Sequence, residues 1–193
     1  MRTAVIVVDM LADYFDEAHP LPITDPARAI VPAVDRLTAA ARAGNHAVVF
    51  ACDSFLPGDF LFGGKMQPHA LRGTPGAEPT ALLHREPDDI VLPKRRFSAF
   101  FKTDLDQTLR TLGVEAVAVA GITTHFCVLT TALDAVALDF RTVVVEDCCA
   151  APTPEMHAAT LDLYRRNPLW PLLRVERLDD YRSELSEQGQ PQE

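Results

Sequence analysis

Several motifs are absent from this 193-residue sequence, and each absence excludes a class of site. There is no Cys-x-x-Cys pair, which excludes zinc ribbons and thioredoxin-like redox sites. The sequence also has no Gly-x-Gly-x-x-Gly, Gly-x-Ser-x-Gly or His-Glu-x-x-His motif. Residues 58–65 superficially resemble a phosphate-binding loop. However, Asp59 stands where that motif needs glycine, and Met66 stands where it needs Ser or Thr.

Basic stretches and long apolar stretches are scarce as well. There are 18 Lys and Arg residues against 27 Asp and Glu, which gives a net charge of -9. Nucleic acids and anionic membranes are bound through Lys and Arg that neutralise phosphates, so we expect neither as a partner. No apolar run reaches the length of a membrane span. Residues 1–3 lead directly into an apolar strand, so we expect no signal peptide.

The cysteines are few for a disulfide framework in a chain of this length. We therefore expect reduced thiols and a cytoplasmic protein. The four cysteines are Cys52, Cys127, Cys148 and Cys149. Cys52, Cys148 and Cys149 have the character of core or loop thiols.

What the sequence does contain is an alternation of buried strands and amphipathic helices. Apolar runs predict strands at residues 4–8, 46–52, 89–92, 116–120, 141–145 and 169–175. Helical spacing and capping residues predict helices starting at Asp25 or at Pro32 and ending at Gly44, and over 103–113, 127–136 and 153–168. Residues 54–79 hold five Gly and four Pro, which is typical of a functional or interface loop.

This order of elements predicts an α/β protein. The expected architecture is a three-layer αβα, Rossmann-like fold with a mostly parallel sheet of about six strands. We expect one domain over residues 1–181 and a polar, flexible C-terminal tail over residues 182–193.

Three strand exits carry side chains that suit nucleophilic chemistry. Asp9 follows the first strand, Lys94 follows the third, and Cys127 lies in the first turn of the helix after the fourth. The carboxyl ends of parallel strands meet where the strand order reverses, so these side chains are expected to converge. The helix N-terminus would favour a thiolate at Cys127. The alternative is that Cys127 is a buried, inert core residue.

With these residues in this order, the sequence resembles the isochorismatase-like cysteine hydrolases, a superfamily that includes nicotinamidases and other small amidases. The matching segments are residues 7–15, Asp53, and residues 69–78, 94–100 and 121–128. The resemblance implies a catalytic triad of Asp9, Lys94 and Cys127. It also implies a cis peptide between Ile122 and Thr123, and an oxyanion hole formed by the backbone N–H groups of Thr123 and Cys127.

The activity implied by this resemblance is hydrolysis of a C–N bond in a small amide, ureido or carbamoyl compound. Cys127 would attack the carbonyl carbon and form a thioester, Asp9 would transfer protons, and Lys94 would stabilise the ionised pair. Water would then release the acid, and no cofactor is expected. Because Cys127 is present, isochorismatase activity itself is disfavoured.

The sequence departs from nicotinamidases at their metal site. Phe55 stands where the first His of an Asp-x-His pair belongs, and Phe60 lies near the place of a further His. Asp53 and His69 alone make a poor divalent site, so no metal is expected. The alternatives are a nicotinamidase with a degenerate metal site, a catalytically silent scaffold of the same fold, and a nucleotide-binding protein.

Aromatic residues near these segments suggest an apolar substrate pocket, although the same residues are also typical of simple core packing. The candidates are Phe15, Phe55, Phe97, Phe100 and Phe126. His125 fits either the pocket or the protein surface. The expected partners are a small-molecule substrate, water, and further copies of the chain in a homodimer or larger assembly.

Overall fold

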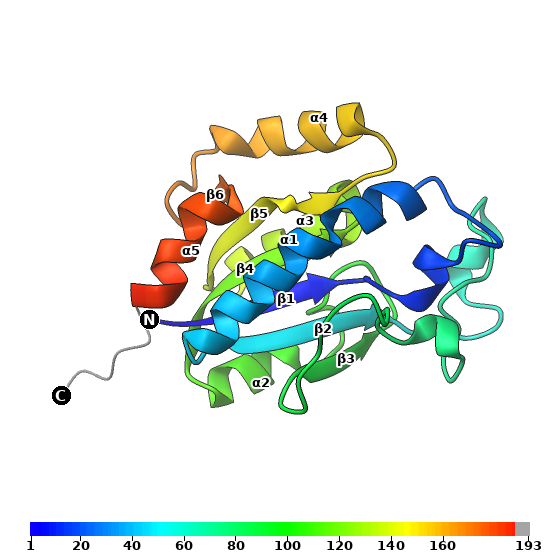
Figure 1. Cartoon of the computed structure of the whole chain (residues 1–193), viewed down its shortest axis with the longest axis horizontal. Helices are drawn as coiled ribbons and strands as arrows, with labels where there is room; N and C mark the ends of the chain where they lie inside the picture. The colour runs from blue at the N-terminus through cyan, green and yellow to red at the C-terminus, as the bar shows by residue number, and fades with distance from the viewer. Residues whose placement is uncertain (188–193) are drawn as a thin grey trace.

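The structure is a computed structural model that describes residues 1–187. Six parallel strands form one sheet in the order β3-β2-β1-β4-β5-β6 (Figure 1). The strands are β1 (Arg2–Val8), β2 (Ala47–Asp53), β3 (Ile90–Lys94), β4 (Val114–Ile122), β5 (Arg141–Ala150) and β6 (Leu173–Glu176). The predicted α/β class and six-stranded sheet are confirmed.

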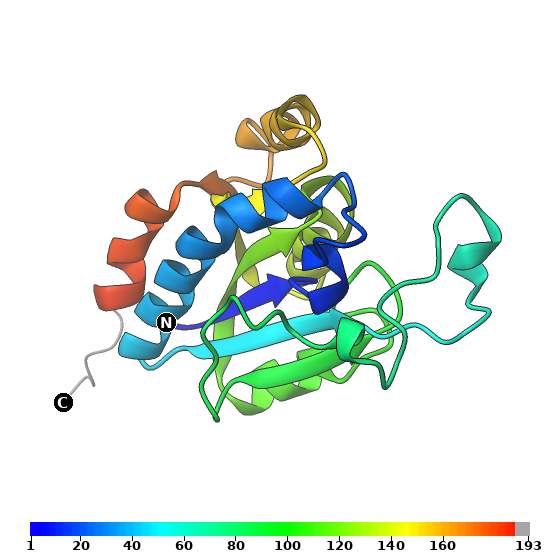
Figure 2. The ribbon, with the colours of Figure 1, turned by 45° about the vertical axis from the view of Figure 1, so that its right-hand side comes forward.

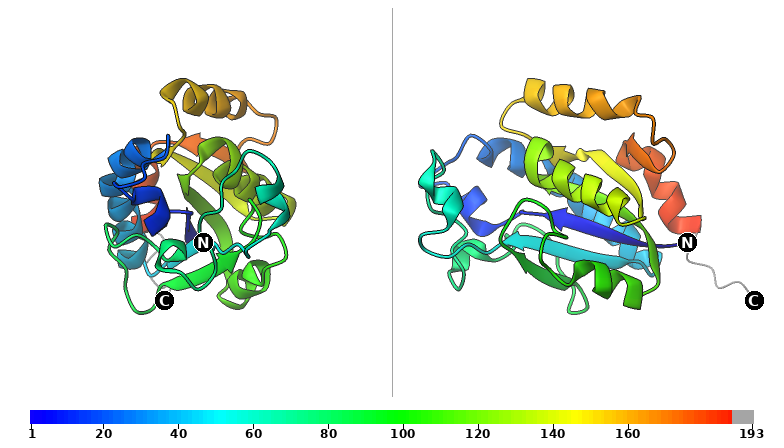
Figure 3. Two further views of the ribbon diagram at one scale, coloured as in Figure 1. Left: turned by 90° about the vertical axis from the view of Figure 1, so that its right-hand side faces the viewer. Right: turned by 180° about the vertical axis from the view of Figure 1, so that it is seen from behind.

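Helices cover both faces of the sheet, which gives the expected three layers. On one face lie α1 (Thr24–Ala43) and α5 (Leu178–Glu187). On the other lie α2 (Leu105–Thr111), α3 (Leu129–Ala137) and α4 (Pro154–Arg165), as the rear view in Figure 3 shows.

The strands are buried on both faces because their residues alternate between two apolar clusters. In β1, Val5 and Val7 pack in the cluster under α1, whereas Ala4, Ile6 and Val8 pack on the opposite side. All five are at most 1% exposed. This burial accounts for the continuous apolar run in the sequence, since a parallel strand covered by helices has no solvent face.

The starts of two helices, α1 and α4, can be compared with the starts predicted from the sequence. For α1 the helix begins at Thr24, whose Oγ1 accepts a bond from Leu21 N at 2.9 Å, and Pro32 lies inside the helix. For α4, the helix predicted from residue 153 is capped by Thr153, whose Oγ1 accepts from Met156 N at 3.2 Å.

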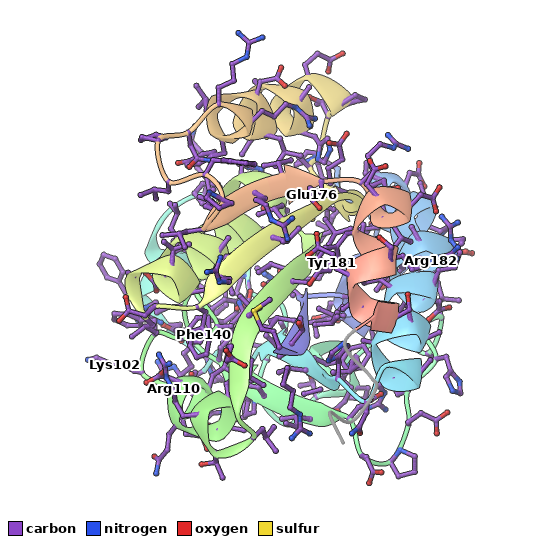
Figure 4. The ribbon with its side chains drawn as sticks, turned by 90° about the vertical axis from the view of Figure 1, so that its left-hand side faces the viewer. Lys102, Arg110, Phe140, Glu176, Tyr181 and Arg182 are labelled. Atoms are coloured by element: carbon purple, nitrogen blue, oxygen red, sulfur yellow. The ribbon has the colours of Figure 1, made fainter. Side chains whose placement is uncertain are left out.

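The expected flexible tail over residues 182–193 is wrong for its first part. The helix α5 continues to Glu187, and its Leu185 is 1% exposed. Two contacts hold the helix: His46 Nε2 donates to Leu185 O at 3.0 Å, and Arg174 binds both carboxylate oxygens of Glu184 at 2.8 Å. Figure 4 shows Tyr181, 2% exposed, between α5 and the strands. Residues 188–193 lie outside the described part of the chain.

The segment between β2 and β3 contains two short 3-10 turns, Phe60–Gly63 and Pro75–Ala77. Its first part, with the turn Phe60–Gly63, projects beyond the carboxyl edge of the sheet, and its later part returns toward the start of β3 (Figure 2). Over residues 1–187, every helix is too short or too polar to span a bilayer.

Candidate active site

The ends of β1, β2 and β3 lie side by side at the carboxyl edge of the sheet, where backbone hydrogen bonds join them. Asp53 and Lys94 are direct register partners at the ends of β2 and β3. Asp9 follows β1 with a positive φ of 53°, and its N–H donates to Ala51 O at 2.8 Å. Its Oδ1 accepts from Asp53 N at 2.8 Å. The sheet register, rather than a loop, therefore places these side chains.

Lys94 is fully buried and its ammonium group joins both carboxylates. Its Nζ lies 2.8 Å from Asp9 Oδ2, 2.6 Å from Asp53 Oδ1 and 3.2 Å from the carbonyl oxygen of Arg96. These contacts use all three donors of the ammonium group. Burial alone would lower the pKa of Lys94, but Asp9, Cys127 and Asp53 outweigh it and raise that pKa above its ordinary value.

Cys127 lies in a wide helical turn over Thr124–Val128 that leads into α3. Its sulfur and the nearest carboxylate oxygens of Asp9 and Asp53 lie within 4.8 Å of one another. Burial, followed by the two carboxylates, raises the pKa of the thiol well above its ordinary value, against the opposing effect of Lys94. This shift opposes the effect of the helix N-terminus, which favours the thiolate.

Asp53 shares the ammonium group with Asp9, a role that the sequence did not suggest. Burial and the neighbouring Asp9 raise the pKa of Asp53 to about 7, while Lys94 opposes the shift. Asp53 thus titrates near neutral pH within a cluster of two carboxylates and one ammonium group.

A cavity of about 250 Å³ opens beside this cluster. Among the predicted aromatic residues, Phe55, Phe97 and Phe126 line it. Phe15 and Phe100 do not, because both are buried in the apolar clusters on either side of the sheet. The remaining lining residues are Asp9, Tyr14, Asp53, Met66, His69, Ile122, Thr123, His125, Cys127 and Pro152.

The predicted backbone feature is also at this cavity, since the Ile122–Thr123 peptide is cis and both residues line the space beside Cys127. Sequence reasoning missed Tyr14, Met66 and Pro152. Tyr14 neighbours the candidate Phe15, so the signal was one residue away. Met66 and Pro152 carry no local signal: Met66 lies in the long segment between β2 and β3, and Pro152 lies in the short connection between β5 and α4.

His69 is held by two hydrogen bonds away from the carboxylates. Its Nδ1 lies 2.8 Å from Gln67 O, and its Nε2 lies 2.8 Å from the Tyr14 hydroxyl. The Phe55 ring packs edge-on against it, with centroids 5.5 Å apart.

The donor set does not fit the divalent metal of nicotinamidases. Within residues 1–187, the donor atoms that converge are those of Asp9, Asp53 and Cys127, and His69 is not among them. Asp53 Oδ1 is bound by the ammonium group of Lys94, and both ring nitrogens of His69 are bound to Tyr14 and Gln67, so these two groups do not form a site with three protein ligands. Phe55 offers no ligand at the position of the first His.

Comparison with known proteins agrees with this architecture. The family model of the isochorismatase domain matches residues 3–173. The chain belongs to the isochorismatase family. A probable inactive nicotinamidase of Arabidopsis thaliana is 36% identical over 83% of this chain and 86% of its own length. The ureidoacrylate amidohydrolase RutB of Pseudomonas syringae pv. syringae is 30% identical over 98% of this chain and 86% of its own length.

Two solved structures share the fold. An isochorismatase-like hydrolase from Alkaliphilus metalliredigens superimposes with a TM-score of 0.83 at 28% identity, covering 95% of this chain and 99% of that one. The N-carbamoylsarcosine amidase of Thermoplasma acidophilum gives 0.78 at 30% identity, covering 93% and 98%.

Proposed function

We propose that the protein is a cysteine-dependent hydrolase of C–N bonds in small amide, ureido or carbamoyl compounds. The observation that carries the proposal is the contact between Lys94 and both carboxylates, with the Cys127 sulfur within 4.8 Å of the carboxylate oxygens of Asp9 and Asp53. The names of the RutB and N-carbamoylsarcosine amidase relatives support an amide or ureido substrate.

The first half of the reaction forms a thioester. The Cys127 sulfur bonds to the carbonyl carbon while its proton passes to the Asp9 carboxylate. The raised pKa of the thiol favours transfer of its proton in the same step as the attack, because it disfavours a free thiolate. Backbone N–H groups of Thr123 and Cys127 would stabilise the oxyanion. When the C–N bond breaks, Asp9 returns the proton to the leaving nitrogen.

The second half consumes water. Asp9 takes one proton of a water molecule, the hydroxyl oxygen bonds to the carbonyl carbon, and the C–S bond breaks. The proton held by Asp9 then restores the thiol. The net reaction is amide plus water to carboxylic acid plus amine or ammonia. Throughout, the Lys94 ammonium group lies 2.8 Å from Asp9 Oδ2, so its positive charge stabilises the negative charge of that carboxylate.

The test is ammonia release from a panel of small amides, ureido compounds and carbamoyl compounds. We expect turnover by the native protein and loss of at least about 1000-fold in Cys127→Ala, since the nucleophile is removed. Cys148→Ala is the matched control, because Cys148 is also buried but does not line the cavity. Added hydroxylamine should divert the product to a hydroxamate, which reports the thioester.

A catalytically silent scaffold is the second candidate, favoured by the "probable inactive" name of the Arabidopsis relative. No ammonia from any compound, with no hydroxamate formed, would support it. Nicotinamide belongs in the panel with and without zinc. Turnover of nicotinamide only with zinc would contradict the argument against a metal and favour the degenerate nicotinamidase.

A further inference from the structure

Tyr14 contributes a hydroxyl group to the cavity beside the cluster of Asp9, Asp53 and Cys127. Its oxygen lies 2.8 Å from Nε2 of His69. The opposite ring nitrogen, Nδ1, lies 2.8 Å from the carbonyl oxygen of Gln67. Neither contact belongs to the triad or to the oxyanion hole.

The direction of these two bonds follows from the chemistry of the groups. A carbonyl oxygen can only accept, so Nδ1 of His69 carries the proton that is donated to Gln67. In the neutral imidazole Nε2 is then an acceptor, and Tyr14 donates its single hydroxyl proton to it. The Tyr14 oxygen is left with acceptor capacity alone.

The ionised carboxylates of Asp9 and Asp53 at this end of the cavity also accept. Burial, followed by the negative charges of Asp53 and Asp9, raises the pKa of Tyr14, so Tyr14 stays a phenol. A substrate entering this end therefore needs N–H or O–H donors. A scissile amide nitrogen supplies them, whereas an ester oxygen does not.

Resting on the proposed function, we propose that Tyr14 recognises the leaving nitrogen of the substrate. Its hydroxyl oxygen accepts an N–H of the scissile amide, and His69, fixed by Gln67, holds the hydroxyl proton away from that nitrogen. The substrate class is then primary and secondary amides and ureido compounds that carry at least one N–H at the bond that breaks.

The contact between the Tyr14 hydroxyl and the scissile N–H also affects the step in which Asp9 returns its proton to the leaving nitrogen. With one N–H directed to Tyr14, rotation of the leaving group is restricted, and the lone pair that develops on nitrogen can be presented to Asp9. Tyr14 would thus act on formation of the thioester and not on its hydrolysis, since nitrogen has left by then.

The experiment compares each amide with the methyl ester of the same acid in native protein and variants. The pairs are benzamide with methyl benzoate, crotonamide with methyl crotonate, and nicotinamide with methyl nicotinate. We expect Tyr14→Phe to lower kcat/KM about tenfold for the amide and less than twofold for the ester. Tyr164→Phe, a half-buried tyrosine outside the cavity, should change neither value.

The histidine variants test the direction of the hydroxyl proton. His69→Leu removes the nitrogen that accepts the Tyr14 hydroxyl proton. Tyr14 can then donate that proton toward the substrate, so the ratio of kcat/KM for the amide to kcat/KM for the ester should fall. His69→Gln restores an acceptor oxygen and should recover part of that ratio. Adding His69→Leu to Tyr14→Phe should cause little further loss, because both act through one oxygen.

Equal loss for amide and ester in Tyr14→Phe would overturn the inference while leaving the cysteine hydrolase intact. An unchanged amide rate in Tyr14→Phe would do the same. If the native protein hydrolyses every ester in a Cys127-dependent way but no amide, the recognition of N–H is wrong. If no compound of these pairs or of the wider panel is hydrolysed, the proposed function fails and this inference fails with it.

Discussion

The side chains of Asp9, Asp53 and Lys94 hold charge where water hardly reaches them. Each is at most 4% exposed. Burying a charge is costly unless it is paired, and even a paired cluster is often no more stable than apolar residues of the same size. The cluster therefore contributes little to stability. Its value is chemical, because the ammonium group keeps a carboxylate next to a buried thiol.

Asp53 gives this cluster a pH dependence that can be measured. Its pKa is raised from 3.8 to about 7, first by burial and then by Asp9. The folded state thus binds the proton more tightly than the unfolded state, and the resulting stability is fully present below about pH 4 and lost as the pH rises through about 7.

The side chain of Asp53→Asn cannot titrate. Between pH 4 and pH 7 the free energy of unfolding of this variant should therefore fall less than that of the native protein, and the two changes should differ by up to about 4 kcal/mol. Urea denaturation at several pH values measures the difference. Asp88→Asn, at an exposed position, serves as the control. Identical pH slopes for Asp53→Asn and the native protein would contradict the assignment.

Much of the site was accessible from the sequence because strand exits are easy to locate. Asp9 and Lys94 end apolar runs, and any parallel sheet brings such ends to one edge. The acceptor bond between Tyr14 and His69 was not accessible, since 54 residues separate the two and no local pattern links them. The surroundings of Cys127 were accessible only in part, because a helix start is visible in a sequence, whereas burial beside two carboxylates, which raises the pKa of the thiol, is not.

At the scale of elements, the approach of β4 to β1 sets the separation of the nucleophile from its base. Val8 and Gly121 are register partners, and Gly121 has a φ of 107°. A Cβ at Gly121 would lie 2.1 Å from Val8 O and 2.7 Å from Val8 N. Both contacts are with backbone, which cannot rotate away.

Gly121→Ala should therefore lower the free energy of unfolding by about 2–4 kcal/mol and also reduce turnover, because Asp9 and Cys127 lie just beyond these two strand ends. Chemical denaturation and ammonia release measure the two effects. Gly63→Ala is the control, since a Cβ there meets nothing within 4 Å. A fully stable Gly121→Ala variant would show that the strands can move apart freely.

The predicted elements with strong periodicity were found, and the weak one was missed. The helix α5 has a mean hydropathy well on the polar side and reads as a polar tail, yet Leu178, Tyr181 and Leu185 fill the cluster under α1. Its position depends on tertiary contacts such as the one to His46, which a pattern search along the chain does not reveal.

At the scale of the whole molecule, charge limits the range of substrates. The chain carries a net charge of -9, and no Lys or Arg is among the described residues that line the cavity. A carboxylate on the substrate would face the buried carboxylates of Asp9 and Asp53. The cation beside them, Lys94, is already shared by those two side chains. An uncharged acyl group is favoured for this reason.

Two compounds that differ chiefly in this charge test the point: crotonamide and fumaramate, in which a carboxylate replaces the methyl group. We expect kcat/KM to be at least about tenfold higher for crotonamide. Added salt should raise the value for fumaramate and leave that for crotonamide nearly unchanged, since screening weakens repulsion. A preference for fumaramate would show that a cation from elsewhere reaches the site.

Assembly and compartment stay predictions for this chain. The homodimer or larger homo-oligomer expected from the sequence can be measured by light scattering at several protein concentrations. The cytoplasmic location requires measurement in cells.

The place of β3 in the sheet has a consequence for how the protein would lose activity. This strand is terminal and pairs on one side only, with β2, yet it carries Lys94. Terminal strands open locally at a lower free energy than central ones. Each such opening would withdraw the ammonium group from Asp9, so heat or mild denaturant should inactivate the protein before its core melts. Amide hydrogens of β3 should then exchange with solvent at the rate at which activity is interrupted.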